Sequence, residues 1–253
     1  MRLGDSSPGG RLRLDAVARY LQDVSDDDTR DAGLRSASWV VRRTVIRVSS
    51  FPVYLEPLAM RTWCSGIGAR WAERRTVIVG EHGGAVDAAT LWVHIDPVTM
   101  KPARLPDQFV ALFGGSALGR HVSARLTLDP PPVDALGAVS VSWTPRFADF
   151  DVLGHVNNAI SWALLEEMLS GRRDLRAPMQ AVVEHGGSVD RGAEVTPIVV
   201  HRADAFDSWL VDGAGRALVS MKVRVDPVPG QPVSQFGHPQ DSAFASAGES
   251  SVT

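Results

Sequence analysis

The sequence predicts an α+β fold of two tandem repeats, in each of which an antiparallel sheet wraps one long helix. Each half of the chain has one helical segment followed by strand-like segments in which apolar residues alternate. Each half also closes on one pattern, since L-W-V-H-I-D-P at residues 91–97 matches M-K-V-R-V-D-P 130 residues later. A helix and then a sheet, twice, with the same ending, indicates an internal duplication.

The first half begins with an amphipathic helix. Its apolar residues recur at i, i+3, i+4 and i+7 and form one stripe, made of Leu14, Val17, Ala18 and Leu21. We expect the acidic run at residues 26–28 to end this helix in a solvated turn. Strands are expected at Trp39–Val48, Met60–Cys64, Trp71–Val79 and Ala88–Ile95.

The second half repeats this order. Its helix, expected at His155–Leu169, is apolar on more than one stripe and should therefore be buried nearly all round. Glu166 and Glu167 lie near the end of this helix, where we expect them to be solvated. Strands are expected at Val139–Trp143, Gln180–His185, Ala193–His201, Ser208–Val211 and Ala217–Val225.

Composition divides the chain into five parts. They are a flexible N-terminus (1–10), the first repeat (11–97), a linker (98–138), the second repeat (139–228) and a disordered tail (229–253). Prolines bracket a short helix in the linker near Gln108–Phe113. Residues 1–10 can hardly supply a strand before the first helix, so that strand is missing or the true start lies upstream.

Charge and cysteine content narrow the function classes. The net charge of −3 gives no reason to expect nucleic acid as a partner. Cys64 is the only cysteine, which excludes an internal disulfide or a CxxC metal site and fits a cytoplasmic location. The histidines show no metal-binding spacing, and no cofactor is expected. No apolar run reaches the roughly 18 residues of a membrane span, and residues 1–10 lack the apolar core of a signal peptide.

One stretch carries a family resemblance. The string P-R-F-A-D-F-D-V-L-G-H-V-N-N-A at residues 145–159, with a Glu later in the helix, resembles the acyl-acyl carrier protein (acyl-ACP) thioesterases and the wider hydroxybenzoyl-CoA-thioesterase-like family. Pieces of the first half, such as W-V-V-R-R and T-W-C-S-G, are similar to the same family in the same order. The resemblance covers roughly residues 10–227 and fits the architecture called the hotdog fold, here a double hotdog.

The resemblance implies an enzyme that hydrolyses fatty acyl-ACP, or acyl-CoA, to a free fatty acid and the carrier thiol in fatty acid biosynthesis. It implies an acyl carrier protein or a coenzyme A thioester as the partner. Because a fused pair of hotdogs already mimics the usual dimer of this fold, both a monomer and a homodimer remain open.

Thioester hydrolysis needs a base or nucleophile, and donors for the developing oxyanion. Asp151, just before the helix, can act as either base or nucleophile. Unpaired amides around Gly154 to Asn157 are suited to polarising the carbonyl, and Gly154 lets the substrate approach the backbone closely. His155 can act as an acid, a base or a carbonyl-orienting donor. Asn157 or Asn158 is expected to hold the catalytic water or the pantetheine amide.

The Asp and Asn residues of this stretch could instead have a purely structural role at the start of the helix. Asp151 and Asn157 are of the types that cap helices, and Asp149 is expected to brace the turn. The resemblance favours function, because a cap requires one such residue and this stretch supplies several. The matching segment of the first repeat, Gly10–Asp15, has no histidine and no asparagine pair, so we expect one active site per chain.

Two positions depart from the plant-type members of the family. An Asn stands between their catalytic Asp and His, where this chain has Leu153. They also carry a Glu-Cys pair in a strand of the second repeat, and our alignment places Ser188–Val189 there, with Glu184 and His185 four residues earlier. The second repeat has no cysteine nucleophile, so the mechanism is expected to rest on Asp151, alone or with His155, helped by Glu184 or Ser188.

The first repeat is expected to shape the acyl pocket and to meet the carrier. Candidate pocket walls, for most of which ordinary core is the alternative, are Trp39, Trp63, Trp71 and Trp92. Residues 1–125 carry 17 Lys/Arg against 13 Asp/Glu, a surplus that suits an acidic carrier protein, although solvated strand faces explain most of it equally well. The arginines concerned are Arg42, Arg43, Arg47, Arg70, Arg74 and Arg75.

Two other functions remain open. Hotdog hydratases and dehydratases resemble D-x-N-P-x-H at this place, whereas this chain has the shorter D-V-L-G-H without Asn-Pro. A non-catalytic acyl-thioester binding protein is the other alternative, and Leu153 together with the missing Glu-Cys pair keeps it open.

Overall fold

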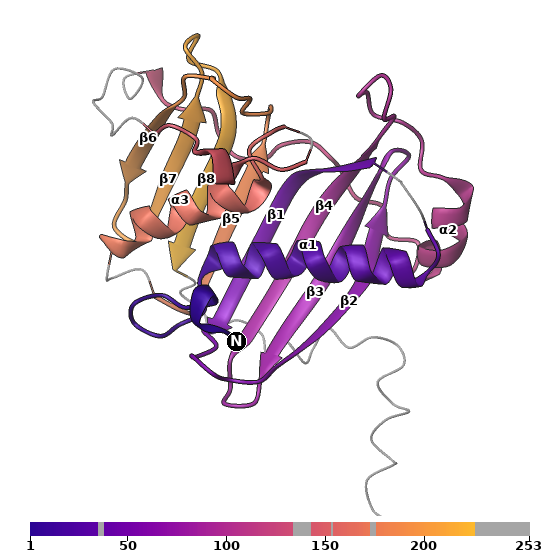
Figure 1. Ribbon diagram of the computed structural model, residues 1–253, viewed down its shortest axis with the longest axis horizontal. Coiled ribbons are helices and arrows are strands. Elements are labelled where there is room, and N and C mark those ends of the chain that lie inside the picture. Colours follow the sequence, from indigo (N-terminus) through magenta and orange to yellow (C-terminus); the bar gives the residue numbers. More distant parts are fainter. Residues whose placement is uncertain (35–37, 134–142, 153, 173–175, 226–253) are drawn as a thin grey trace, which may run out of the picture.

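An eight-stranded antiparallel sheet forms the centre of the molecule (Figure 1). The computed structural model describes residues 1–34, 38–133, 143–152, 154–172 and 176–225. The strand order is β2-β3-β4-β1-β5-β8-β7-β6, so each repeat supplies one half of the sheet. The strands are β1 (Ser38–Ser50), β2 (Leu58–Ile67), β3 (Trp71–Gly80), β4 (Ala85–Ile95), β5 (Met179–His185), β6 (Thr196–His201), β7 (Ala205–Val211) and β8 (Ala217–Val225).

Two long helices cover the same face of this sheet. In Figure 1, α1 (Leu14–Asp31) crosses the strands of the first repeat, and α3 (Asn158–Ser170) lies over those of the second. The short helix α2 (Asp107–Phe113) confirms the expected linker helix and lies near the end of α1. This is the predicted α+β double hotdog. Among the described residues no helix combines the length and the apolar character that crossing a bilayer requires.

The two repeats are joined by the pairing of β1 with β5. β1 pairs antiparallel with β4 of its own repeat on one edge and with β5 on the other. The second pairing runs from Arg43 opposite Glu184 to Val48 opposite Met179. Because both edges of β1 are hydrogen-bonded, the sheet continues without a break from one repeat to the next.

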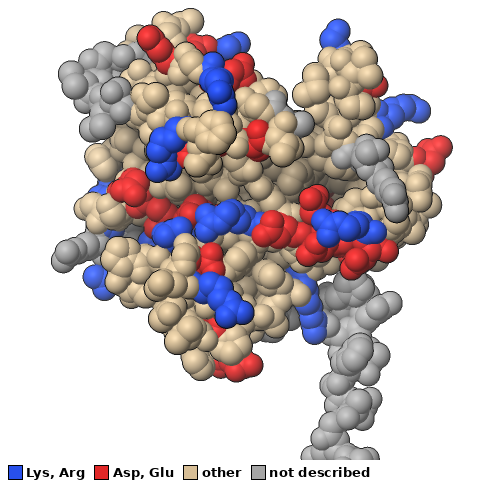
Figure 2. All heavy atoms as spheres, viewed as in Figure 1, with Lys and Arg blue, Asp and Glu red and all other residues tan. Residues whose placement is uncertain are grey.

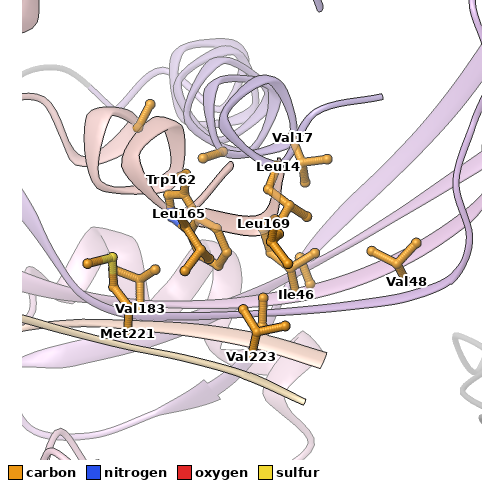
Figure 3. Packing of buried hydrophobic residues seen from close by; sticks show 14 of the residues in the cluster. Leu14, Val17, Ile46, Val48, Trp162, Leu165, Leu169, Val183, Met221 and Val223 are labelled. Carbon is orange, nitrogen blue, oxygen red and sulfur yellow. The ribbon is translucent and has the colours of Figure 1, made fainter. Parts of the chain in front are cut away.

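One apolar core lies between the helices and the sheet (Figure 3). Leu14 and Val17 of α1 and Trp162 and Leu165 of α3 are fully buried. They pack on sheet residues that include Ile46, Val183, Met221 and Val223. The stripe predicted for α1 is therefore its buried face, and the apolar character of α3 reflects contact with both the sheet and α1.

The helix starts confirm the internal duplication. A 3-10 turn precedes each helix, Leu3–Asp5 before α1 and Phe147–Asp149 before α3, and an aspartate side chain accepts a backbone amide in each. In each repeat a glycine with positive φ follows, Gly10 (80°) and Gly154 (77°). The same bridge then closes the loop, Ser6 with Leu12 in the first repeat and Phe150 with Val156 in the second.

Several parts of the chain differ from the sequence prediction. α1 continues through the acidic run to Asp31, because Asp28 pairs with Arg74 of β3 and Asp27 with Arg30. Residues 1–10 are not a loose arm: the Met1 ammonium donates to the Glu56 carbonyl at 2.8 Å, and the 3-10 turn follows.

The helix of the second repeat starts at Asn158 rather than at His155. His155 instead bridges to Asp190 and Val156 to Phe150, which keeps both residues outside the helix. The strand expected at residues 139–143 and the tail at 229–253 lie outside the described residues, except for Trp143, which bridges to Val195.

Glu166 links the two helices and corrects the expectation that it is solvated. It is 9% exposed, and its carboxylate accepts two bonds from the Arg11 guanidinium, at 2.9 and 2.7 Å. The same carboxylate accepts a hydrogen bond, at 2.6 Å, from the backbone amide of Leu14, which is the first residue of α1. A side chain of α3 thus caps the N-terminus of α1, where a negative charge is favoured by the helix dipole.

We predict that Glu166→Gln destabilises the fold by about 1–3 kcal/mol, because it removes the charge that binds Arg11 and the start of α1. Urea unfolding followed by circular dichroism measures this change. Glu167→Gln is the matched control: its side chain is exposed, so a change within about 0.5 kcal/mol is expected. Equal effects of the two variants would contradict the capping role.

Candidate active site

A cavity of about 460 Å³ lies where the two repeats meet. Its walls come from the start of α3, the end of β5 with the loop after it, and the start of β1. Of the seven residues assigned to the site from sequence, four lie in these walls. They are Asp151, His155, Asn158 and Ser188.

A tight turn holds Asp151 beside His155. The Asp151 amide donates to the His155 carbonyl at 2.9 Å, and the His155 amide lies 3.4 Å from Asp151 Oδ1. Gly154 closes the turn by donating to the Asp151 carbonyl at 3.0 Å, with a φ of 77°. Glycine is therefore needed here for the left-handed backbone, and Gly154 is not among the residues that line the cavity. Leu153 lies outside the described residues.

The backbone amides expected to polarise the carbonyl are engaged within the chain. Val156 donates to the Val189 carbonyl at 3.0 Å and Asn157 to the Asp149 carbonyl at 2.8 Å, while the amides of residues 154 and 155 serve the turn. The amide of Asn158, the first residue of α3, has no acceptor among the described residues. A donor at the positive end of the helix dipole is thus one residue further along than predicted.

Asn157 is the N-cap of α3. Its Oδ1 accepts the amide of Ala159 at 2.9 Å, and Asn157 does not line the cavity. This is the capping role that the sequence left as the alternative. Asn158, its neighbour, is the asparagine that faces the cavity.

Asp149 stabilises the loop that precedes α3. It is 1% exposed, and it accepts the Arg146 amide at 2.7 Å and the Arg146 guanidinium at 2.8 Å. Burial alone would raise the pKa of Asp149, but these bonds outweigh it and hold the pKa below its ordinary value. The charged form is therefore the stable one, and the loop before α3 keeps its shape.

Glu184 does not join the site. Its side chain lies on the sheet face opposite the helices, where the carboxylate accepts the amides of Thr127 and Leu128 at 2.9–3.0 Å and lies 3.6 Å from Arg43. Glu184 thus fastens the linker to the sheet. Ser188 is exposed in the loop after β5, so the residues that end this strand are Glu184 and His185 rather than Ser188–Val189.

Arg42 and His185 also line the cavity, although neither was assigned to the site from sequence. Arg42 is the extra residue of a β-bulge, since Val41 pairs with Trp92 and Arg43 with Leu91. Its guanidinium donates to the His185 carbonyl at 2.6 Å. His185, on the helix-facing side of β5, also lines the cavity. The period-two alternation of β5 was the available signal, because it places His185 on the same side as Val183.

A second cavity, of about 470 Å³, lies within the first repeat. Trp39 lines both cavities, and Trp92 lines the second cavity and a small gap of about 10 Å³ that also borders Asn158. Trp63 lines neither cavity, and the Trp71 indole donates to the Val122 carbonyl at 2.8 Å to hold the linker. Of the four tryptophans, Trp39 and Trp92 therefore line a cavity of the first repeat.

Most of the expected surplus arginines have partners within the chain. Arg74 pairs with Asp28, Arg75 with Asp87, and Arg43 donates to linker carbonyls. On the face shown in Figure 2, charges of both signs follow one another in a band across the middle. The remaining exposed members of the set are Arg47 and Arg70. No group of three metal-ligating side chains occurs among the described residues.

Comparison with known proteins identifies the family. Residues 1–113 match the acyl-ACP thioesterase N-terminal domain, and residues 138–215 match the acyl-ACP thioesterase C-terminal domain. The chain belongs to the acyl-ACP thioesterase family. The first domain model covers β1 to β4 and α2, the second covers α3 and β5 to β7, and most residues that line the first cavity fall in the second.

Relatives of this acyl-ACP thioesterase family member occur in bacteria and plants. An uncharacterised protein of Mycobacterium tuberculosis strain H37Rv is 33% identical over 189 residues, which is 74% of each chain. A chloroplast acyl-[acyl-carrier-protein] hydrolase of Cuphea viscosissima is 30% identical over 51% of this chain and 33% of its own length. The 12:0-ACP thioesterase of Umbellularia californica shares the fold, with a TM-score of 0.73 at 19% identity over 88% of this chain and 94% of that one.

We predict that Asn157→Asp and Asn157→Ser keep near-normal stability and turnover, whereas Asn157→Ala loses about 1 kcal/mol of stability, because the first two retain a capping oxygen. Thermal unfolding and a thiol-release assay on the same preparations measure both properties. Loss of turnover in all three variants at unchanged stability would show that the Asn157 amide group itself takes part in the reaction.

Proposed function

We propose that this chain hydrolyses fatty acyl-ACP, or acyl-CoA, to a free fatty acid and the carrier thiol, as a step of fatty acid biosynthesis. The observation that carries the proposal is the cavity at the N-terminus of α3, where Asp151, His155 and Asn158 face one space. A carboxylate, an imidazole and a helix N-terminus are the groups that thioester hydrolysis requires. Family membership supports the same reaction class.

In the proposed reaction Asp151 acts as the general base. The water oxygen forms a bond to the thioester carbon as Asp151 takes the water proton. The N-terminus of α3, through Asn158, stabilises the oxyanion that results. The C–S bond then breaks as the carbonyl re-forms, and the carrier thiolate takes up the proton held by Asp151, which regenerates the base. His155 is beside Asp151 and serves as a donor to the carbonyl or to the leaving sulfur.

The acyl chain is proposed to run from this cavity into the first repeat. Asn158 borders both the cavity that Asp151 lines, called the site cavity, and the small gap. Trp92 borders both that gap and the second cavity, called the far cavity. The far cavity has an apolar wall that includes Trp39, Ala72 and Phe109. Burial of an acyl chain against these side chains favours binding by about 0.8 kcal/mol per methylene group.

Asp151→Asn is expected to lower kcat for acyl-thioester hydrolysis by about 10²–10⁴-fold while acyl-thioester binding survives, since the general base is lost and the cavity is kept. Release of free thiol from acyl-ACP and acyl-CoA of short, medium and long chain length measures turnover, and fluorescence titration with a non-hydrolysable acyl thioether measures binding. Absence of thiol release by the wild-type protein from every substrate would sink the proposed function in favour of an acyl-thioester binding protein.

Ala72→Leu should shorten the accepted acyl chain, because the larger side chain occupies part of the far cavity. We expect kcat/KM to fall about tenfold or more for long chains and to stay unchanged for short ones. Ala89→Leu is the control, since Ala89 lies on the opposite face of the sheet. The same chain-length profile for wild type and Ala72→Leu would place the acyl chain elsewhere.

A further inference from the structure

The passage between the site cavity and the far cavity is nearly closed. Val41 lines the site cavity and the small gap, and Trp92 lines that gap and the far cavity. The two residues are cross-strand partners, Val41 on β1 and Trp92 on β4, so this pair lies between the two cavities. The gap measures about 10 Å³, which is room for roughly one water molecule. A methylene chain can therefore cross the gap only if a side chain that borders it moves.

Most side chains around the gap are held in the core. Leu21 of α1 and Trp162 of α3 border the gap and are only 3% and 1% exposed. The hydroxyls of Thr44 and Thr90, which also border it, are hydrogen-bonded to each other at 3.4 Å. Displacing any of these side chains would disturb the close packing between the helices and the sheet.

Trp92 is held less firmly than these residues. It is half-buried, and part of its side chain borders the far cavity. Its indole Nε1 donates no hydrogen bond to a described residue. The indoles of Trp71 and Trp209, by contrast, donate to the carbonyls of Val122 and Asp129, at 2.8 and 2.9 Å. Because a shielded donor without a partner destabilises the position it occupies, little opposes a turn of the Trp92 ring.

Trp39 also lines both cavities, but aromatic contacts fix it in place. Its ring centroid lies 5.0 Å from that of Phe109 and 5.2 Å from that of His94. Trp92 makes no ring contact of this kind with a described residue. Of the two tryptophans between the cavities, Trp92 is thus the one that can move.

We propose that Trp92 determines which acyl chain lengths are accepted, because its indole closes the passage to the far cavity until it turns aside. This inference rests on the proposed function. A short acyl chain stays in the site cavity and needs no such movement, whereas a long chain reaches the far cavity only after it. The affinity for a long chain is then reduced by the fraction of molecules in which the passage is open.

Trp92→Ala tests the proposal, because it opens the passage permanently. We expect kcat/KM for palmitoyl-CoA to rise about tenfold, and kcat/KM for butyryl-CoA to change less than about threefold. A tryptophan that serves only as a wall of the acyl pocket predicts the opposite, since its removal takes apolar contact away from the long chain. Trp63→Ala is the matched control: Trp63 lines neither cavity nor the gap, so the wild-type ratio of the two substrates is expected.

Trp92→Phe provides a second variant should Trp92→Ala fail to fold. Phenylalanine keeps one aromatic ring in the packing and lacks the other, so the ratio of long-chain to short-chain kcat/KM should rise in the same direction by about threefold. A ratio that is unchanged or lower in the folded variants would overturn the proposal while the proposed function stands.

Fluorine NMR of protein labelled with fluorotryptophan follows the movement itself, since the resonance missing from Trp92→Phe belongs to Trp92. A non-hydrolysable palmitoyl-CoA thioether is expected to shift this resonance, and the butyryl analogue to leave it in place. Equal shifts with both analogues would overturn the proposal. A wild-type protein that shows the chain-length-dependent shift without thiol release would overturn only the proposed function, and one that binds neither analogue would overturn both.

Discussion

The antiparallel pairing of β1 with β5 is the contact on which the site depends. It places the end of β5, with His185, beside the start of β1, with its bulge at Arg42. Neither repeat alone brings these two strand ends together. Since α3 must also pack on β5, the N-terminus of that helix is carried to the same place. The cavity is therefore a property of the joined sheet, although its chemical groups come mainly from the second repeat.

Duplication explains both the similarity and the asymmetry of the two halves. Each helix is entered through the same turn, but equivalent positions carry different residues, Ser7 for Asp151 and Arg11 for His155. In the first repeat, Arg11 is used to bind Glu166 of α3. The segment that could have formed a second site has thus become part of the contact between the helices. In the described part of the chain, the turn before α3 lines the candidate site, and the equivalent turn before α1 binds Glu166 instead.

Most helices and strands could be predicted from local patterns of apolar residues. The errors in the prediction arose where contacts between distant parts of the chain decide the structure. Alternation and the helical stripe predicted the strands and α1, because both report which side of one element is buried. The start of α3 was placed three residues early, since His155 is held out of the helix by Asp190, which lies far along the chain. The bond of Glu166 to Leu14 and the place of His185 in the cavity depend on tertiary packing in the same way. Asp151 and His155 could be proposed for the site from sequence because they lie in one short stretch that resembles the family.

The positions of these residues determine the electrostatics of the site cavity. Asp151 is the acidic group of its lining, which also includes Arg42 and Asn158 at the N-terminus of α3, and burial lowers the pKa of His185 to about 4. A negative charge that develops on a carbonyl oxygen there would meet the positive end of the helix dipole in a partly shielded space, where such interactions are stronger than in water. Asp149, tied to Arg146, keeps its own charge beneath the loop and out of the cavity. The arrangement thus separates the carboxylate that shapes the loop from the carboxylate that can accept a proton.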